Sequence, residues 1–569
     1  MNEFSVVIGG EAGQGIKTIE YVLTRIFKFS GLNVFSTKEY ESRIRGGVNS
    51  TELAVSSRPV NTFLDKIDLL LVLKDGVVEH LHKRIDDNTI VLGEKENISD
   101  QEKKNLTSFF EIPIQELAKE AGRKIYSNSV VVGIICGLFG LQEEVVENVL
   151  EKYFSKKGQD IVDNNLNAVQ IGKVAGVKLK DENQIDFDIE IDSDIKDDIL
   201  LNGTEAVALG AMNGGCNFVS FYPMSPATGV ATFFAQHSNE MEVVVEQVED
   251  EIGAVNMAQG AWYAGARALI TTSGGGFALM NEGLSLAGVT ETPLVFHIGQ
   301  RPGPGTGLPT RMGQEDLLFT LFGGHGEFPR IILAPGDLKD GYLLGKKAFD
   351  LADKYQVPVF ILTDQYYLDS NYNIDGLPFS DEQPEHYIVE TEENYKRYKL
   401  TEDGISPRGV PGHGKGVVAV DSDEHDQEGH ITENFDTRIK MVDKRLKKID
   451  KILDDYVDPD LIGTEDYDIL LISWGSTKNA VAAALEEIDN DKIGYLHIKQ
   501  MAPLHSKIED YLARANKSIC IENNATGQLA KIIKMETEQS IDSTILKYNG
   551  LPFSREELIE KIKSEIREV

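Results

Sequence analysis

The chain has 569 residues, too many for one hydrophobic core, so we expect three or four domains. Hydrophobic residues make up 41% of the chain and charged residues 26%, proportions typical of a globular protein. The formal net charge of −35 disfavours binding to nucleic acid or to an anionic membrane surface.

Residues 1–180 alternate predicted strands with predicted helices, which indicates an α/β layer structure. The segment opens with an apolar strand at residues 4–8 instead of a secretory signal. Apolar runs at 69–73 and 89–92 are typical of buried parallel strands. No run in the chain has the roughly 18 apolar residues that cross a bilayer, so we expect a cytoplasmic protein.

A glycine-rich turn at residues 9–15 joins the first strand to a helical pattern that starts at Ile16. Backbone N–H groups in such a turn can bind a phosphate, with Gly13 and Gly15 as candidates. The spacing differs from the dinucleotide fingerprint, and a tight turn needed only for packing explains it equally well. Arg43 and Arg45 could add two guanidinium groups, although exposed arginines are usually just solvated.

The rest of the chain divides by composition. An acidic, weakly hydrophobic stretch at 181–198 predicts an interdomain linker extended by self-repulsion. Predicted strands and helices return at 199–370 and again at 457–569, separated by a Pro- and Gly-rich connector at 371–456 that ends in a basic helix. We therefore expect an α/β protein of three α/β units with parallel or mixed sheets.

Four motifs of the segment 199–370 follow predicted strands, where ligands bind in open α/β sheets. They are Tyr222-Pro-Met-Ser225-Pro, an acidic run that ends at Glu251 before a Gly/Ala helix, the glycine turn 273–276, and Gln300-Arg301-Pro-Gly-Pro-Gly-Thr306. The acidic run is explained by helix capping or by one desolvated carboxylate that shares a proton with a ligand nitrogen. Arg301 suits a substrate carboxylate.

These motifs, in this order, resemble those of the 2-oxoacid:ferredoxin oxidoreductases, and the likeness extends over nearly the whole chain. The turn at 9–15 and Ser-Arg-Ile-Arg-Gly-Gly at 42–47 look like a gamma domain fused ahead of the alpha subunit. The resemblance implies three domains: a gamma domain, a pyrimidine-binding domain for thiamine diphosphate, and a transketolase C-terminal-like domain.

Site roles carry over from the resemblance residue by residue. Glu251 is expected to be catalytic and to meet the aminopyrimidine of thiamine diphosphate, with Tyr222 and Gly274 beside the cofactor. Arg301 is expected to hold the substrate carboxylate, with Ser225 and Thr306 nearby. The chain departs from the family pattern at three positions. Ser225 replaces Thr, Gly275 replaces Pro and Gly305 replaces Ser, which loosens two turns but keeps the charged groups.

Other family components are missing from this sequence. It has no Gly-Asp-Gly motif for Mg²⁺, and its three cysteines form no C-x-x-C pair. The resemblance places Mg²⁺, the diphosphate and a [4Fe–4S] cluster on a beta subunit, with ferredoxin as electron acceptor and an alpha–beta heterodimer or its dimer as the assembly. We predict no metal site in this chain, and we expect the loop of His425 and His430 to be structural.

The implied reaction is oxidative decarboxylation of a 2-oxoacid with coenzyme A to acyl-CoA, CO₂ and reduced ferredoxin. The fused layout favours 2-oxoglutarate, while pyruvate and branched-chain or aryl 2-oxoacids stay open. Two alternatives are a non-catalytic scaffold that binds acyl-CoA or a nucleotide and a transketolase-like enzyme without redox partners. The pair Glu251 and Arg301 argues against the first, and the missing Mg²⁺ motif against the second.

Overall fold

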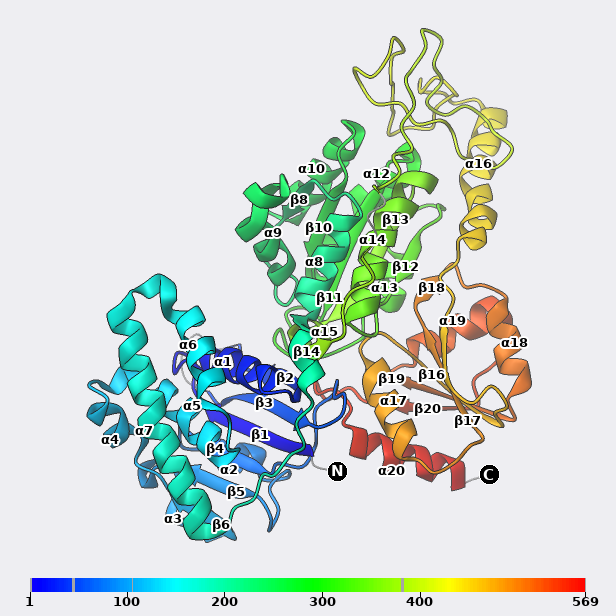
Figure 1. Cartoon of the computed structure of the whole chain (residues 1–569). Helices are drawn as coiled ribbons and strands as arrows, with labels where there is room; N and C mark the ends of the chain where they lie inside the picture. Colours follow the sequence, from blue (N-terminus) through cyan, green and yellow to red (C-terminus); the bar gives the residue numbers. More distant parts are fainter. Residues whose placement is uncertain (1–2, 43–46, 105, 380–382, 568–569) are drawn as a thin grey trace. The chain divides into compact units, whose positions relative to one another are not determined.

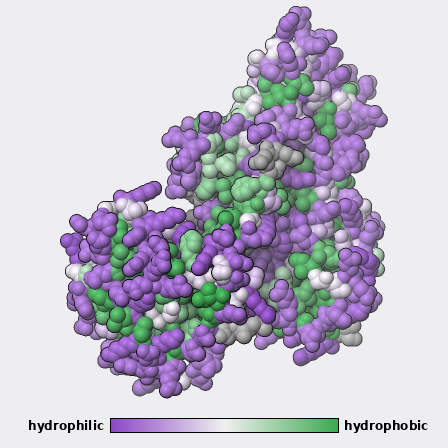
Figure 2. Space-filling view, in the orientation of Figure 1, coloured by the Kyte–Doolittle hydropathy of each residue, from purple (hydrophilic) through white to green (hydrophobic). Residues whose placement is uncertain are grey.

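A computed structural model describes residues 3–42, 47–104, 106–379 and 383–567. Its contacts divide the chain into two compact units, the first made of residues 1–201, 369–376 and 554–557 and the second of the remaining residues. Hydrophilic side chains cover most of the face in Figure 2, with smaller apolar patches between them. Over the described ranges, no helix is long and apolar enough to cross a membrane.

An eight-stranded mixed sheet forms the centre of the first unit (Figure 1). In spatial order its strands are β6 (Ser108–Glu111), β5 (Ile90–Gly93), β4 (Leu69–Val72), β1 (Glu3–Gly10), β3 (Asn49–Ser56), β2 (Asn33–Glu39), β14 (Asn371–Ile374) and β7 (Ile199–Asn202). Strands β1, β4, β5 and β6 are parallel, whereas β3 runs antiparallel to β1 and β2. All four residues of β4 are buried, as its continuous apolar run predicts.

Seven α-helices accompany this sheet in the described part of the first unit. They are α1 (Ile16–Phe29), α2 (Val77–Leu81), α3 (Asp100–Lys103), α4 (Ile114–Glu120), α5 (Ser127–Leu138), α6 (Glu143–Phe154) and α7 (Gln159–Asn183). Helices α5 and α7 approach very closely. A Cβ at Gly133 would lie 2.1 Å from Val169 O, and one at Gly172 would lie 2.1 Å from Val130 O. Small residues therefore let the two helix backbones pack against each other.

The acidic stretch expected to be an extended linker, 181–198, is not a solvated chain. Helix α7 continues to Asn183, and Ile185, Phe187 and Ile189 are buried in the hydrophobic core of the first unit. Alternating apolar residues hold the stretch on the protein surface in spite of its negative charge. The domain boundaries at 180 and 199 stay predictions.

A seven-stranded sheet forms one layer of the second unit. Its strands in spatial order are β18 (Gln500–Ala502), β12 (Ile331–Leu333), β13 (Pro358–Asp364), β11 (Leu294–Gln300), β10 (Ala268–Thr272), β8 (Phe218–Phe221) and β9 (Val244–Gln247). All neighbouring pairs are parallel except β18 with β12. Its helices are α8 (Gly203–Asn213), α9 (Thr228–Met241), α10 (Glu251–Tyr263), α11 (Gly274–Leu279), α12 (Asn281–Thr290), α13 (Leu317–Phe322), α14 (Leu338–Tyr355) and α15 (Gln365–Asp369).

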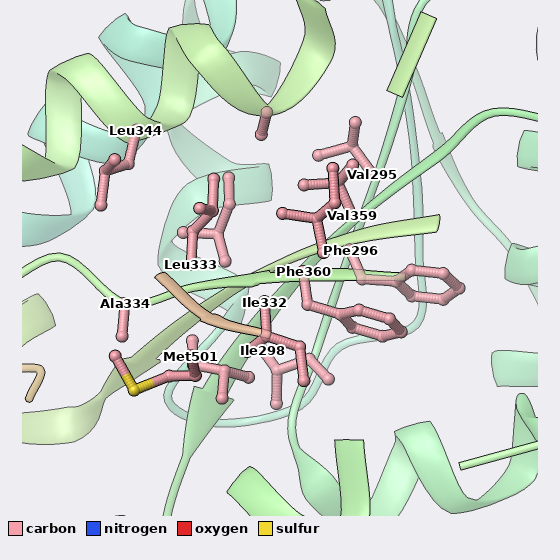
Figure 3. Close-up of a cluster of buried hydrophobic side chains, with 14 of the residues drawn as sticks. Val295, Phe296, Ile298, Ile332, Leu333, Ala334, Leu344, Val359, Phe360 and Met501 are labelled. Carbon is pink, nitrogen blue, oxygen red and sulfur yellow. The ribbon is translucent and has the colours of Figure 1, made fainter. Parts of the chain in front are cut away.

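A five-stranded sheet follows, with the order β15 (Asp460–Gly463), β17 (Ile493–Ile498), β16 (Ile469–Trp474), β19 (Lys517–Glu522) and β20 (Ser543–Leu546). Its helices are α17 (Thr477–Glu487), α18 (Lys507–Arg514), α19 (Gln528–Thr537) and α20 (Arg555–Arg567). One hydrophobic core reaches from the seven-stranded sheet into this one. Figure 3 shows its centre, where Met501 packs near Ile298 and Ile332. The prediction of an α/β fold with parallel and mixed sheets is confirmed.

The connector carries mostly loops and then helix α16 (Phe435–Asp454). Three basic side chains of this helix, Lys444, Arg445 and Lys448, are buried. The Nζ atoms of both lysines lie within 2.7 Å of the buried carboxylate of Glu291, which follows α12. Helix α16 is therefore fixed to the seven-stranded layer by buried ion pairs.

The His425 loop is ordered by hydrogen bonds. The ring of His425 is fully buried 3.8 Å from that of Tyr398, and its Nδ1 pairs with Asp423 O at 3.0 Å. His430 is exposed; its backbone N donates to Asp426 Oδ1 at 3.0 Å, and its ring Nδ1 lies 3.9 Å from Asp426 Oδ2.

Candidate active site

The four motifs of the second unit lie at one edge of the seven-stranded sheet. Parallel strands β8, β9, β10 and β11 end at Phe221, Gln247, Thr272 and Gln300, and each motif lies at or directly after the end of its strand. The carboxyl ends of parallel strands meet at the same edge, so the motifs are brought together by topology.

Glu251 is the first residue of α10 and is buried, with 4% of its surface exposed. Capping of this helix falls to Asp250, whose Oδ1 accepts a hydrogen bond from Gly253 N at 2.7 Å. Glu251 Oε1 is buried and has no hydrogen-bond partner among the described residues. An unpaired buried carboxylate oxygen costs free energy in the protein alone, so a ligand donor is its expected partner.

The glycine turn predicted at 273–276 forms the N-cap and the first helical turn of α11, and its glycines let this carboxylate approach the backbone. A Cβ at Gly276 would lie 2.7 Å from Glu251 Oε1 and 2.2 Å from Thr272 Oγ1. A Cβ at Gly275 would meet no atom closer than 3.9 Å. Gly274 is buried beside a second carboxylate, that of Asp316, and its Cβ would lie 2.4 Å from both carboxylate oxygens.

Arg301 joins two of the motifs. Its Nη1 donates to Ser225 O at 2.7 Å, so the loop after β11 is tied to the loop after β8. Partial burial lowers the pKa of Arg301, while the negative charge of Asp316 opposes that shift. Tyr222, Ser225 and Thr306 are exposed at this edge. The structure thus brings the expected cofactor and substrate residues of this unit to one place.

Asp316 was not expected from the sequence. It occupies the N-cap position of α13, yet its side chain makes no capping hydrogen bond, and its Oδ2 is buried without a partner in the described ranges. Burial above all, and then the charge of Glu315, raises the pKa of Asp316 to about 7, whereas Arg301 lowers it. The sequence signal for Asp316 is weak: it follows Glu315 and precedes an apolar run. Two acidic residues before an apolar helix normally indicate only helix capping.

Buried polar side chains on strands β10, β11 and β13 hydrogen-bond to one another beside the loop that follows β11. His297 Nδ1 and Nε2 each lie 2.8 Å from a hydroxyl, Thr271 Oγ1 and Thr363 Oγ1 respectively. Burial lowers the pKa of His297 to about 3, so the ring is neutral. Gln300 donates to Thr363 O at 3.2 Å and accepts from Asp316 N at 3.1 Å. These contacts fix the loop that carries Arg301 and Asp316, and the His297 ring stays neutral at pH 7.

Residues that follow strand β19 of the five-stranded sheet also hydrogen-bond to this loop. Gln314 N donates to Asn523 O at 2.8 Å, and Asn523 N donates back to Gln314 Oε1 at 2.9 Å. Gln528 accepts from Leu318 N at 2.8 Å and donates to Glu315 O at 2.8 Å. Asn523 and Gln528 therefore have a structural role, since their hydrogen bonds fix residues 314–318.

The candidates for coenzyme A lie in the first unit. Gly13 and Gly15 have positive φ angles of 93° and 79°, which favour glycine, and Gly15 is the N-cap of α1. A Cβ at Gly15 would also lie 2.1 Å from Asn128 Nδ2. Lys74, which the sequence did not single out, pairs with Glu11 of this turn at 3.0 Å. Arg43 and Arg45 lie outside the described residues.

One cluster in the second unit has metal-ligand spacing. Oxygen or nitrogen atoms of Asp340, Asp460 and His497 lie within 4.8 Å of one another. However, Lys478 Nζ lies 2.8 Å from each of the two carboxylates and 2.6 Å from Asp337. The ammonium group already neutralises these carboxylates, so we assign the cluster to a buried ion-pair network.

Known proteins of one enzyme family are similar to this chain along its whole length. Residues 209–444 match the family described as pyruvate flavodoxin/ferredoxin oxidoreductase, thiamine diP-bdg, and residues 5–175 match pyruvate ferredoxin/flavodoxin oxidoreductase. The 2-oxoacid:ferredoxin oxidoreductase subunit alpha of Sulfolobus sp is 32% identical, over 99% of this chain and 97% of the relative. The 2-oxoglutarate synthase subunit KorA of Archaeoglobus fulgidus is 30% identical, over 64% of this chain and 99% of the relative.

A solved structure resembles the complete chain. The 2-oxoglutarate:ferredoxin oxidoreductase from Magnetococcus marinus, with 2-oxoglutarate, coenzyme A and succinyl-CoA bound, is 31% identical. The match covers 100% of both chains with a TM-score of 0.92.

Proposed function

The chain belongs to the thiamine-diphosphate-dependent 2-oxoacid:ferredoxin oxidoreductases, and from this premise we propose that it is the alpha subunit, with a fused gamma domain, of an enzyme that acts on 2-oxoglutarate. The observation that carries the assignment of the site is the buried Oε1 of Glu251 at the carboxyl edge of the sheet, which has no partner in the described ranges of the chain. A scaffold that only binds has no use for such a costly group.

The residues present fit the pyrimidine end of thiamine diphosphate. Glu251 offers a carboxylate oxygen that lacks a partner among the described residues, and the missing side chain at Gly276 lets this carboxylate approach the backbone. Tyr222, exposed at the same edge, offers an aromatic face. When bound, the cofactor supplies the carbanion that attacks the keto carbon and the system that accepts charge as CO₂ leaves.

This chain would contribute a proton and the orientation of the substrate. Glu251 would share a proton with a ring nitrogen of the pyrimidine. The buried carboxylate would be stabilised by the hydrogen bond that the protonated ring nitrogen donates to it. Arg301 would hold the substrate carboxylate through charge-assisted hydrogen bonds. Ser225 and Thr306, exposed on the two loops that meet at Arg301, would offer hydroxyl groups to the same ligand.

The choice of 2-oxoglutarate rests on the relatives. The Magnetococcus marinus structure and the Archaeoglobus fulgidus relative both carry that substrate in their names, and the first is similar along the complete chain. Coenzyme A would be the acyl acceptor, with Gly13, Gly15, Arg43 and Arg45 as its candidate contacts in the first unit. Pyruvate and branched-chain or aryl 2-oxoacids are the alternative substrates.

A beta subunit would complete the enzyme. The relatives that match this chain over its full length are named as alpha subunits. The Mg²⁺, the diphosphate and a [4Fe–4S] cluster would belong to the partner, ferredoxin would accept the electrons, and a cytoplasmic alpha–beta heterodimer or its dimer would be the assembly.

The test is viologen reduction by the chain co-expressed with its partner subunit, supplied with thiamine diphosphate, Mg²⁺ and coenzyme A. We expect 2-oxoglutarate to give the highest kcat/KM, above pyruvate and 2-oxoisovalerate. Glu251→Ala is expected to lower kcat by about 100-fold or more, since it removes the proton-sharing group. Equal kcat in Glu251→Ala and wild type would refute the role of Glu251, and full activity with pyruvate alone would refute the substrate.

A further inference from the structure

Asp316 lies at a helix N-cap but does not cap the helix with its side chain. An Asp at a helix N-cap normally accepts a hydrogen bond from the first turn, which stabilises the helix by about 1 kcal/mol. Asp316 makes no such bond, although it is the N-cap of α13. Its carboxylate instead packs on the backbone of Gly274, where a Cβ would lie 2.4 Å from either oxygen. Oδ2 is buried there and lacks a protein partner in the described residues.

Two charged side chains, Arg301 and Glu315, act on Asp316, and two further acidic residues, Glu251 and Asp364, lie on neighbouring elements. Arg301, on the loop after β11, favours the ionised form, and Glu315 opposes it. Glu315 is itself occupied, since its Oε2 accepts from Gly303 N at 2.9 Å. Glu251 lies beyond the glycine turn. Asp364, at the end of the adjacent strand β13, binds Ser476 Oγ at 2.6 Å.

The balance between burial and these charges brings the pKa of Asp316 to about 7. Asp316 therefore exchanges a proton near neutrality, beside the arginine that faces the substrate. An ionised Asp316 would compete for the charge of Arg301 and would repel an incoming carboxylate.

We propose that Asp316 is a positioning residue that takes up one proton from solvent when the carboxylate of the 2-oxoacid binds to Arg301. The neutral carboxyl then leaves the positive charge of Arg301 to the substrate. By linkage, protonation of Asp316 tightens substrate binding by the same factor by which the substrate favours protonation. No bond of the substrate changes in this step. The inference rests on the proposed role of Arg301.

The test measures KM and kcat of the complete enzyme with its partner subunit between pH 6 and 9. For the wild type, KM for the 2-oxoacid is expected to rise about tenfold per pH unit above pH 7, because each unit removes tenfold of the protonated form. The KM for coenzyme A should not follow this rise. In Asp316→Asn, which is neutral at every pH, the KM for the 2-oxoacid should be flat and lower than the wild-type value at pH 9.

A second variant keeps the inference testable if Asp316→Asn does not fold. Glu315→Gln removes the charge that raises the pKa of Asp316, so the rise in KM should begin at lower pH. A purely structural role for Asp316 would predict no such displacement. A wild-type KM without the alkaline rise, the same rise in Asp316→Asn, or an unmoved onset in Glu315→Gln would each overturn the inference.

Arg301→Ala separates this inference from the proposed function. If this variant leaves the KM for the 2-oxoacid unchanged, the proposed role of Arg301 fails. If it raises that KM while Asp316→Asn keeps the alkaline rise, only the role of Asp316 fails.

Discussion

Glu251 and Asp316 place carboxylates against the same glycine turn, and each has a buried oxygen without a partner in the described part of the chain. Glu251 Oε1 meets the turn at Gly276, at 2.7 Å from the position of a Cβ there, and Asp316 meets it at Gly274, at 2.4 Å. Gly275 lies between them, and a Cβ there would make only ordinary contacts, at 3.9 Å from Gly305 O and Met224 Sδ. The turn therefore separates two acidic groups, and its outer glycines set how closely each approaches.

Substitution within this turn should separate chemistry from stability. Gly276→Ala must displace the flexible end of Glu251 and crowd Thr272 Oγ1 at 2.2 Å, so we expect kcat/KM to fall about 100-fold. The cost in stability should be about 1–3 kcal/mol, typical of an overpacked core. Viologen reduction and thermal unfolding measure the two effects.

Gly275→Ala is the matched control, since its Cβ would meet no atom closer than 3.9 Å. It should leave kcat/KM within about twofold and stabilise α11 slightly, because Ala is the better helix residue. Equal losses of activity in the two variants would contradict the assignment of Glu251 as the group displaced.

Arg301→Lys should affect the binding of one substrate. A lysine retains the charge but loses the planar pair of donors, and it would also lose the contact between Nη1 and Ser225 O. We expect the KM for the 2-oxoacid to rise roughly 10- to 100-fold, the range of one charged hydrogen bond. The KM for coenzyme A serves as the internal control, and a rise in both constants would instead indicate a distorted protein.

The elements of the fold could be predicted because their signals are local. The apolar runs at 69–73 and 89–92 form strands β4 (Leu69–Val72) and β5 (Ile90–Gly93), since a buried parallel strand needs a continuous apolar segment. The four motifs at the sheet edge could be located for the same reason, because strand ends are visible in the sequence.

What could not be predicted depends on partners far along the chain. Lys444 resembles a solvated helix residue, but its partner Glu291 lies 153 residues away. The environment of Asp316 is likewise made by Gly274 and Arg301, on two other segments. Sequence periodicity carries no information about such contacts.

Asp364 gives a prediction for the pH dependence of stability. It is 1% exposed, and burial raises its pKa to about 6 although Ser476 Oγ and Tyr367 N donate to it. Between pH 4 and 6 the folded protein retains a proton that the unfolded chain releases, so stability falls as pH rises through this window. Asp364→Asn should therefore raise the free energy of unfolding at pH 8 by up to about 3 kcal/mol, and have little effect near pH 4.

Thermal unfolding of Asp364→Asn at pH 4.5 and pH 8 measures this difference. Asp353→Asn is the matched control, since Asp353 is equally buried but pairs with Arg267 at 3.0 Å and with Arg408 at 2.5 Å. That variant should be less stable than the wild type at both pH values. A lower melting temperature for Asp364→Asn at pH 8 would show that the carboxylate is needed in its ionised form.

Glu291 should be essential for the attachment of helix α16. Its carboxylate lies 2.7 Å from Lys444 Nζ and 2.5 Å from Lys448 Nζ, with all three side chains 1% exposed. Burial lowers the pKa of both lysines and the charge of Glu291 opposes that shift, so Glu291→Gln removes the group that holds their protons and should cost about 3–5 kcal/mol in urea unfolding. Lys448→Met in that background should recover part of the loss, because one buried charge is removed together with its desolvation cost.

Glu282→Gln, on the exposed face of α12, should change stability by less than about 0.5 kcal/mol. Burial raises the pKa of Glu291, but the charges of Lys444 and Lys448 outweigh burial and hold that pKa far below its usual value. The wild-type advantage should therefore shrink as the pH falls below about 4.3, where the unfolded chain takes up a proton that the folded protein does not. A difference that stays the same between pH 7 and pH 3 would rule out the ion pairs as its source.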